Sequence, residues 1–301
     1  MAEKAMQERR NQGQRCLRKK TMSYADRIFK NMCRDILKNG TDTRGEIVRP
    51  HWEDGTPAYT VKRFGVVNRY DLRKEFPAIT IRRTAIKSAF DEILWIYQKK
   101  SNKLSELNSH IWDQWADENG TIGTCYGDVI GRKFIYKGEE IDQMDYVLKQ
   151  LRENPFSRRI MTNMYQYQYL HGGGLDPCAY SMTYNVTQSP DGLVLNAILN
   201  QRSQDVLAAS NWNVAQYACL LIAVSQVSHM IPGELVHVVA DCHIYDRHIP
   251  MVEELLTRPE HPAPKVWLNP EVKDFYEFTA EDLHVEDYVT EPQIKNIPIA
   301  I

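Results

Sequence analysis

The chain has 301 residues, of which 43% are hydrophobic and 25% are charged, and its formal net charge is −2. This composition is typical of a globular protein with a large core, and it excludes a general electrostatic attraction to nucleic acid or to a membrane surface. No apolar run approaches the roughly 20 residues that a membrane-spanning helix needs.

The chain begins with a basic, polar arm, residues 1–21, that lacks the apolar stretch of a secretory signal. We expect this arm to be solvated or helical, followed by one domain over residues 22–301, and we expect the protein to be cytoplasmic. Six cysteines are scattered without a CxxC pair or a His at ligand spacing. We therefore expect free thiols and no metal site.

The predicted elements mix helices and strands without regular alternation. In chain order they are a strand at 59–69, helices at 84–97 and 144–151, strands at 180–187 and 193–200, a helix at 214–230, and strands at 235–240 and 265–268. Thr84 is the expected N-cap of the first helix, and Ser189 to Gly192 is an expected hairpin turn. Because the helix at 214–230 is apolar on nearly every face, we expect it at the centre of a single α+β domain.

Cys178 is the strongest candidate for a reactive residue. It follows the glycine run 172–174, where a flexible segment meets a predicted strand. Segments that carry arginine lie on either side of it in the sequence, at Ser157 to Arg159 and at Gln201 to Asp205. Arginine forks match phosphate oxygens, and nearby guanidinium groups favour a thiolate. The pattern favours a nucleotide phosphate site beside an activated thiol.

Asn213 is a candidate for reading the base. Its side-chain amide offers a donor and an acceptor, which match the N3–H and O4 edge of uracil, whereas a carboxylate would suit cytosine. Taken alone, an Asn at the start of a helix is more often a cap. His243 and Tyr245, at the end of a predicted strand, add groups that can reach a sugar hydroxyl.

These motifs, read in order, resemble the thymidylate synthase family, and most closely the form found in Bacillus and its phages. The resemblance runs from about Met22 to the last residue. It is carried by Glu92 to Trp95, His110 to Trp115, Tyr126-Gly127, Ser157 to Arg159, Pro177-Cys178, Gln201 to Ser203 with Asp205, Asn213 to Ala215, Asp241 with His243 to Tyr245, and Pro298 to Ile301, and in the Bacillus form also by Trp52 to Ala58 and Asn269 to Phe275.

The resemblance implies reductive methylation of dUMP to dTMP with 5,10-methylenetetrahydrofolate as co-substrate. Cys178 would add to C6 of the pyrimidine, and Asn213 and Asp205 would position the reactants. Tyr126 and Glu92 would serve proton removal from C5.

The resemblance also implies a homodimer that pairs through one face of a large mixed sheet. The implied substrate-binding residues are Gln201, Arg202, Ser203, Asn213, His243 and Tyr245, with Arg158 and Arg159 contributed across the interface. The folate would contact Ile111, Trp112, Trp115, Leu175 and Asp205, while Ala300 and Ile301 close over it. dUMP and reduced folate are thus the expected partners, with no requirement for nucleic acid, a membrane or a metal.

Two segments depart from the family pattern. The usual Leu-Gly-x-Pro-Phe-Asn approach to the base-reading Asn is here Ala208 to Asn213, with the Gly, Pro and Phe replaced. An arginine of the early phosphate loop is replaced by Gly55, and Arg49 can stand in for it. The first departure leaves open a pyrimidine nucleotide hydroxymethylase that uses the same folate. A catalytically silent nucleotide- or RNA-binding homologue is a third possibility, and the retained Trp112 favours methylation.

Overall fold

The computed structural model describes residues 21–170 and 175–301. Residues 1–20 of the expected arm and the glycine run 172–174 lie outside the described residues. None of the helices within the described part is long and apolar enough to cross a membrane.

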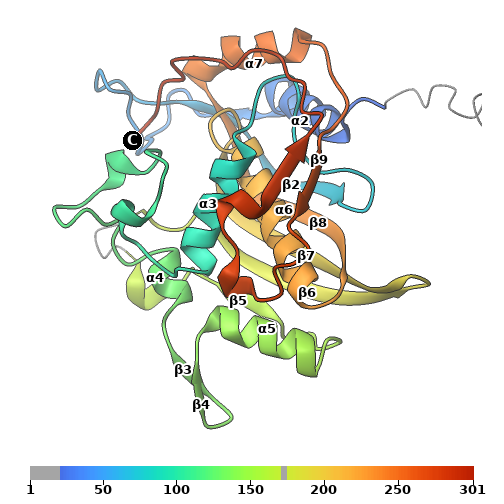
Figure 1. Ribbon diagram of the computed structural model, residues 1–301. Coiled ribbons are helices and arrows are strands. Elements are labelled where there is room, and N and C mark those ends of the chain that lie inside the picture. Colours follow the sequence, from blue (N-terminus) through green and yellow to red (C-terminus); the bar gives the residue numbers. More distant parts are fainter. Residues whose placement is uncertain (1–20, 171–174) are drawn as a thin grey trace, which may run out of the picture.

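One large mixed sheet organises the fold (Figure 1). Its six strands lie in the order β1-β2-β8-β7-β6-β5, and only the β7–β8 pair is parallel. Two further pairs, β3–β4 and β9–β10, are antiparallel. The strands are β1 (Thr41–Asp42), β2 (Thr60–Asp71), β3 (Phe134–Tyr136), β4 (Glu139–Ile141), β5 (Met161–Asn163), β6 (Ala179–Ser189), β7 (Gly192–Asp205), β8 (Ile231–Tyr245), β9 (Lys265–Leu268) and β10 (Leu283–Glu286). The five predicted strands are confirmed, but β7 and β8 extend several residues further, and the predicted hairpin turn joins β6 to β7.

The helices confirm the predicted α+β class and add three that the sequence patterns left out, α2, α4 and α7. They are α2 (Tyr24–Asn39), α3 (Ile86–Tyr97), α4 (Gly127–Ile130), α5 (Gln143–Glu153), α6 (Ser210–Val227) and α7 (Ile249–Thr257). Short 3-10 turns occur at η1 (Leu104–Glu106), η2 (Asp113–Trp115), η3 (Tyr167–Tyr169), η4 (Asp246–His248), η5 (Phe275–Glu277) and η6 (Ala280–Asp282).

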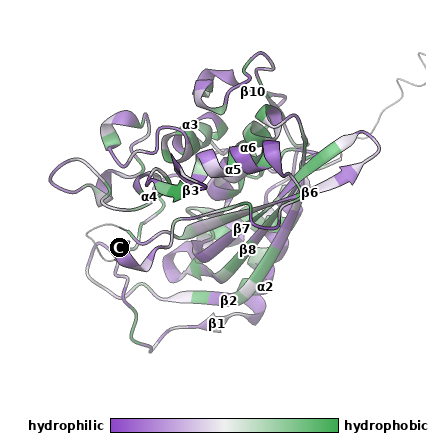
Figure 2. Ribbon diagram, turned by 90° about the horizontal axis from the view of Figure 1, so that it is seen from below, coloured by the Kyte–Doolittle hydropathy of each residue, from purple (hydrophilic) through white to green (hydrophobic). Residues whose placement is uncertain are grey.

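Helix α6 is the buried centre of the fold, as expected. It lies between the sheet and α3, and Figure 2 shows α3, α5 and α6 on the same side of β2, β7 and β8. Leu221 and Val224 are fully buried, and the rings of Tyr217 and Tyr97 meet edge to face at 6.3 Å. Because each buried aliphatic side chain contributes about 1.5–3 kcal/mol, this packing fixes α6 against the strands that carry the site.

The expected Thr84 cap is wrong. The N-cap of α3 is Ala85, which makes no side-chain cap bond. The backbone N–H of Thr84 donates to the Tyr288 hydroxyl at 3.0 Å, and the Thr84 hydroxyl has no partner among the described residues. The helix starts one residue later than the pattern indicated, so the hydroxyl does not face the free N–H groups of the first turn.

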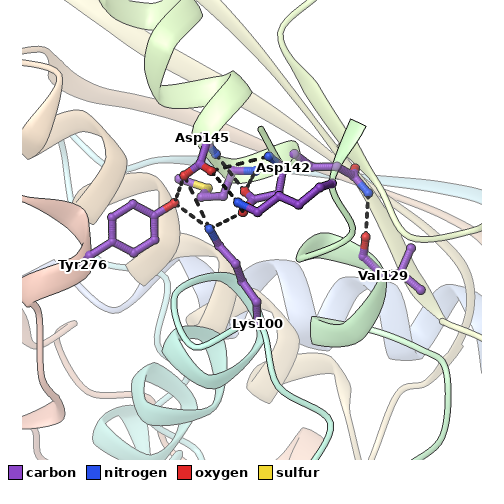
Figure 3. A network of polar contacts seen from close by, with 8 residues as sticks. Lys100, Val129, Asp142, Asp145 and Tyr276 are labelled. Atoms are coloured by element: carbon purple, nitrogen blue, oxygen red, sulfur yellow. Dashed lines mark hydrogen bonds and ion pairs between the residues drawn. The ribbon is translucent and has the colours of Figure 1, made fainter. Parts of the chain in front are cut away.

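A buried polar network holds the segment between α3 and α5 in place (Figure 3). The carboxylate of Asp142, with no exposed side-chain surface, pairs with Lys100 at 2.5 Å and Lys133 at 2.7 Å. Asp142 also caps α5 by accepting from backbone N–H groups, and Tyr276 joins the network by donating to Asp145 at 2.5 Å. Two ammonium partners and the cap offset the cost of burying this carboxylate.

The sheet face opposite α6 exposes a row of apolar side chains. Phe64 on β2 is 91% exposed, Val67 is 53% exposed, and Ile198 on β7 and Met161 on β5 are each 41% exposed. Exposed apolar side chains gathered on one face are typical of a surface that another protein covers.

Candidate active site

Strand pairing brings the predicted site residues of β7, β8 and the start of β6 to one end of the sheet. In the parallel β7–β8 pair, Ser203 lies beside Asp241 and Asp205 beside His243. On the other side of β7, the N–H of Arg202 donates to the Cys178 carbonyl at 2.9 Å. Three segments that are distant in the sequence therefore converge because of their register.

Cys178 is the one partly exposed thiol among the five cysteines of the described residues. Arg202 holds its loop: Nε and Nη2 donate to the carbonyls of Pro177 at 3.0 Å and Asp176 at 2.7 Å, and Nη2 lies 3.7 Å from Cys178 Sγ. Burial nevertheless raises the pKa of the thiol, although the charges of Arg202 and Arg49 oppose this effect. The expectation that neighbouring arginines hold a thiolate is therefore wrong for the ligand-free chain, because desolvation outweighs their attraction.

Tyr126 packs directly against Cys178 in a strained backbone conformation. Its hydroxyl accepts a hydrogen bond from the Cys178 N–H at 3.2 Å, and its φ angle of 45° lies in the left-handed region. The next residue has to be glycine, since a Cβ at Gly127 would lie 2.2 Å from the Ser101 carbonyl oxygen. Strain of this kind persists where the surroundings fix it, and here it directs the tyrosine ring into the site.

Glu92 on α3 is buried with indole donors on both oxygens. Trp112 Nε1 donates to Oε1 at 3.0 Å, and Trp212 Nε1 donates to Oε2 at 2.6 Å. The side chain is 3% exposed. Burial raises its pKa from 4.5 to about 7, although these two donors and the Gln216 amide oppose the rise. A carboxyl group with this pKa can take up and release a proton at neutral pH.

Asn213 lies in the first turn of α6, so it is not the helix cap; the N-cap is Ala209. Its amide sits between two glutamines: Gln201 Nε2 donates to Oδ1 at 3.2 Å, and Asn213 Nδ2 faces Gln216 Oε1 at 3.4 Å. Gln201 in turn accepts from Nε2 of the buried His237 at 2.8 Å. This chain of donors and acceptors fixes which side of the Asn213 amide is the acceptor.

Asp205 is linked through His248 to the C-terminal segment. The His248 ring, fully buried, places Nδ1 3.3 Å from Asp205 Oδ1 and donates from Nε2 to the Pro298 carbonyl at 2.8 Å. Burial alone would raise the pKa of Asp205, but His248 and the Ala208 N–H hold it below the usual value. The C-terminal segment is also held by the loop that contains His51. Ile301 and His51 exchange two backbone hydrogen bonds, at 2.9 and 3.0 Å.

The loop that contains His51 is fastened beside the sugar-reading candidates. Trp52 meets Tyr245 edge to face at 5.5 Å and donates to Asp246 at 3.0 Å. Tyr245 also packs against His243 at 4.9 Å. The same loop carries Arg49; burial raises the pKa of both Cys178 and Tyr245, and the charge of Arg49 opposes this rise in each. Arg49 is thus close enough to act on the site electrostatically. This is required if Arg49 takes the role of the phosphate-loop arginine that Gly55 replaces.

The predicted folate residues form an aromatic surface around Tyr126. Trp112 lies between Tyr126 at 5.2 Å and Trp115 at 5.4 Å, measured between ring centroids. Leu175 is partly buried against the core, whereas Ile111 is 42% exposed. Of these side chains, Trp112 contacts Glu92 directly.

Arg158 and Arg159 are both exposed, on the turn before β5 at the edge of the sheet. Arg159 lines a surface hollow with Phe134, Tyr146 and Met161. In the single chain they stand apart from the strand end that carries Cys178, as residues that bind a partner's ligand would.

Sequence reasoning missed His248, His237, Gln216 and the contact of Trp212 with Glu92. Gln216 carried a signal, because it follows Asn213 by three positions on one helix. Across residues 21–170 and 175–301, no cluster of His, Cys, Asp or Glu is arranged to hold a metal ion.

Comparison with known proteins places this arrangement in a family. The family model described as thymidylate synthase matches residues 27–300. The chain belongs to the thymidylate synthase family. It is 40% identical over 272 residues to thymidylate synthase 1 of Bacillus spizizenii, which covers 89% of this chain and 96% of the relative. The thymidylate synthase of Bacillus phage phi3T matches with the same identity and coverage.

A solved structure extends the likeness to the whole fold. The thermostable thymidylate synthase A from Bacillus subtilis superposes with a TM-score of 0.86 at 37% identity, covering 92% of this chain and 99% of that chain. The predicted single α+β domain with a large mixed sheet is therefore confirmed, and thymidylate synthases are generally dimeric.

Proposed function

We propose that this chain catalyses the reductive methylation of dUMP to dTMP with 5,10-methylenetetrahydrofolate, through covalent addition of Cys178 to C6 of the pyrimidine. The observation that carries the proposal is the partly exposed Cys178, whose sulfur lies 3.7 Å from the Arg202 guanidinium and whose backbone N–H donates to the Tyr126 hydroxyl. The likeness to thymidylate synthases over nearly the whole chain supports it.

The nucleophile has to be activated during binding. The thiol is mainly protonated in the ligand-free chain, since burial raises its pKa. Attack on C6 requires the thiolate, and the guanidinium groups of Arg202 and Arg49 are the charges that favour it. The same arginines and Ser203 supply donors for the nucleotide phosphate.

The base is read by an amide that is already oriented. Gln201 donates to Oδ1 of Asn213, which leaves the Nδ2 side to donate to O4 and a free lone pair on Oδ1 to accept from N3–H. His243 and Tyr245 lie together at the end of β8, where they can bind the 3′-hydroxyl of the deoxyribose. These contacts favour a uracil nucleotide.

Proton transfer and folate binding involve a second set of residues. We assign the removal of the proton from C5 to Tyr126, and Glu92, with a pKa of about 7, can pass protons through water. The apolar surface for the folate rings is provided by Trp112, Trp115 and Leu175. Asp205 provides the polar contact to the folate. The docked Ile301 closes this side and excludes water, so that a hydride from the folate completes the methyl group.

The active unit is proposed to be a homodimer. The exposed apolar face around Phe64 and Ile198 would pack against the same face of a second copy, as in a two-fold interface. Arg158 and Arg159 would then reach the partner's phosphate. In the single chain both arginines are exposed, so they are available to a second molecule.

Product analysis tests the function. Purified protein incubated with dUMP and 5,10-methylenetetrahydrofolate should give dTMP and one equivalent of dihydrofolate. A hydroxymethyl product, heavier by one oxygen, with tetrahydrofolate as co-product would refute methylation. Folate-dependent tritium release from C5-labelled dUMP is common to both reactions, so its absence would instead point to the silent nucleotide-binding alternative.

A further inference from the structure

The segment that departs from the family pattern places a second indole against Glu92. Trp212 stands where the resemblance leads one to expect Phe, whose ring has no donor. In this chain Trp212 Nε1 donates to Glu92 Oε2 at 2.6 Å, while Trp112 Nε1 donates to Oε1 at 3.0 Å. The two indoles come from separate elements, the first turn of α6 and the start of η2.

The rest of the altered segment anchors this tryptophan. Asn211, where the family pattern has Pro, presents its amide oxygen to Arg82 and accepts from Nε at 2.9 Å and Nη2 at 2.7 Å. The buried Arg82 also donates to the Leu207 carbonyl. The first turn of α6 is therefore tied down on both sides of Ala209. Trp212 is only half-buried, so it borders the site and does not merely fill the core.

We propose that Trp212 is a positioning residue for the reaction, whose indole N–H holds Oε2 of Glu92 in place beside the pyrimidine site. The inference rests on the proposed function, in which Glu92 handles protons for the base. An indole can only donate, so each N–H requires a lone pair on the oxygen that it meets. The two donors thereby fix the rotation of the carboxyl group and favour its ionised form.

Besides the two indoles, the Gln216 amide also opposes the rise in the pKa of Glu92, whereas the titratable groups around the carboxyl do not. The titratable groups that act on it are Asp91 on its own helix, Tyr126 at the start of α4, and Tyr217 on α6. A neighbouring carboxylate disfavours a second negative charge, and the two buried tyrosines are neutral at ordinary pH. The indole donors therefore have a large influence on when Glu92 ionises.

Trp212→Phe tests this, because it keeps an aromatic ring of the kind that the family pattern has there and removes the donor. We expect the pKa of Glu92 to rise by about one pH unit, since a hydrogen bond to a charged group is lost. The limb of the kcat–pH profile that Glu92 governs should move to higher pH by the same amount, with little change in KM for dUMP. Trp267→Phe, on β9, is the matched control and should leave the profile unchanged.

A second measurement separates this inference from the proposed function. Carbon-13 NMR of protein labelled at glutamate side-chain carboxyls follows the titration of Glu92 directly, with Glu92→Gln to assign its signal. A titration in Trp212→Phe that moves up supports the role of Trp212, even if the wild type fails to make dTMP and the proposed function falls. Superimposable Glu92 titrations in wild type and Trp212→Phe would overturn the inference, whatever the activity.

Discussion

Replacing Glu92 by Gln tests whether burying this ionisable side chain lowers the free energy of unfolding near neutral pH. The pKa of Glu92 rises from an ordinary 4.5 to about 7 on folding, first because of burial. Between these two values the folded state keeps a proton that the unfolded state has released. The contribution of Glu92 to the free energy of unfolding should therefore be greatest below pH 4.5. It should fall as the pH rises toward 7.

The size of the effect follows from the two pKa values. At 1.36 kcal/mol per pH unit, the full loss is about 3 kcal/mol, and about 2.5 kcal/mol of it falls between about pH 5 and about pH 8.5. Glu92→Gln has no such titration. Its amide cannot accept from both Trp112 and Trp212, which adds a penalty, but that penalty does not vary with pH.

The assay is urea unfolding of wild type and Glu92→Gln across this pH range, at one fixed protomer concentration because dimerisation contributes to stability. Titrations elsewhere in the protein cancel in the difference between the two free energies of unfolding. That difference should shift in favour of Glu92→Gln by about 2.5 kcal/mol as the pH rises. A difference that stays flat with pH would show that Glu92 ionises as it does in the unfolded chain, and the argument from burial would fail.

Three other variants probe the remaining parts of the site. Cys178→Ser should lower turnover by about three orders of magnitude or more while dUMP still binds, and appreciable dTMP formation would rule out the covalent step. Asn213→Asp should reduce the preference for dUMP over dCMP by about 10- to 100-fold in kcat/KM, because a carboxylate repels O4; an unchanged ratio would contradict base reading by this residue. Deletion of Ile301 removes two backbone hydrogen bonds to His51, so KM for the folate should rise by about thirtyfold, whereas an unaltered KM would mean that the docked tail plays no part in folate binding.

The candidate site residues could be predicted from their motifs, but their convergence could not. The strand patterns at 193–200 and 235–240 stop short of Asp205 and His243, and it is the parallel register of β7 and β8 that sets these two residues side by side. The central helix was predictable, since a segment that is apolar on every face has to be buried on every face. Its first turn, beginning at Ser210, was missed, and the helix ends at Val227, before the predicted end at residue 230.

Other features depend on packing that no local pattern encodes. Thr84 has the right residue type for a cap, but Tyr288, about two hundred positions away, binds its N–H and the helix starts later. Likewise, the arginines around Cys178 suggested a thiolate, whereas the fold turns the Arg202 guanidinium onto the carbonyls of the loop and desolvates the sulfur. Residue type predicts which interactions are possible, and burial decides which of them prevails.

The same burial acts on three acids of the site and leaves them in three different states. Desolvation would raise the pKa of Asp205, Glu92 and Cys178 alike, so what separates them is the donor that each one meets. Asp205 meets His248, whose own pKa is raised by this contact, and a backbone N–H, and the pKa of Asp205 falls. Glu92 meets two neutral indoles, which leave its pKa at about 7. Cys178 meets a guanidinium that is already engaged, and its pKa stays raised. A fixed anion, a proton carrier and a nucleophile that ionises only during reaction are the roles that dUMP methylation would assign to these groups.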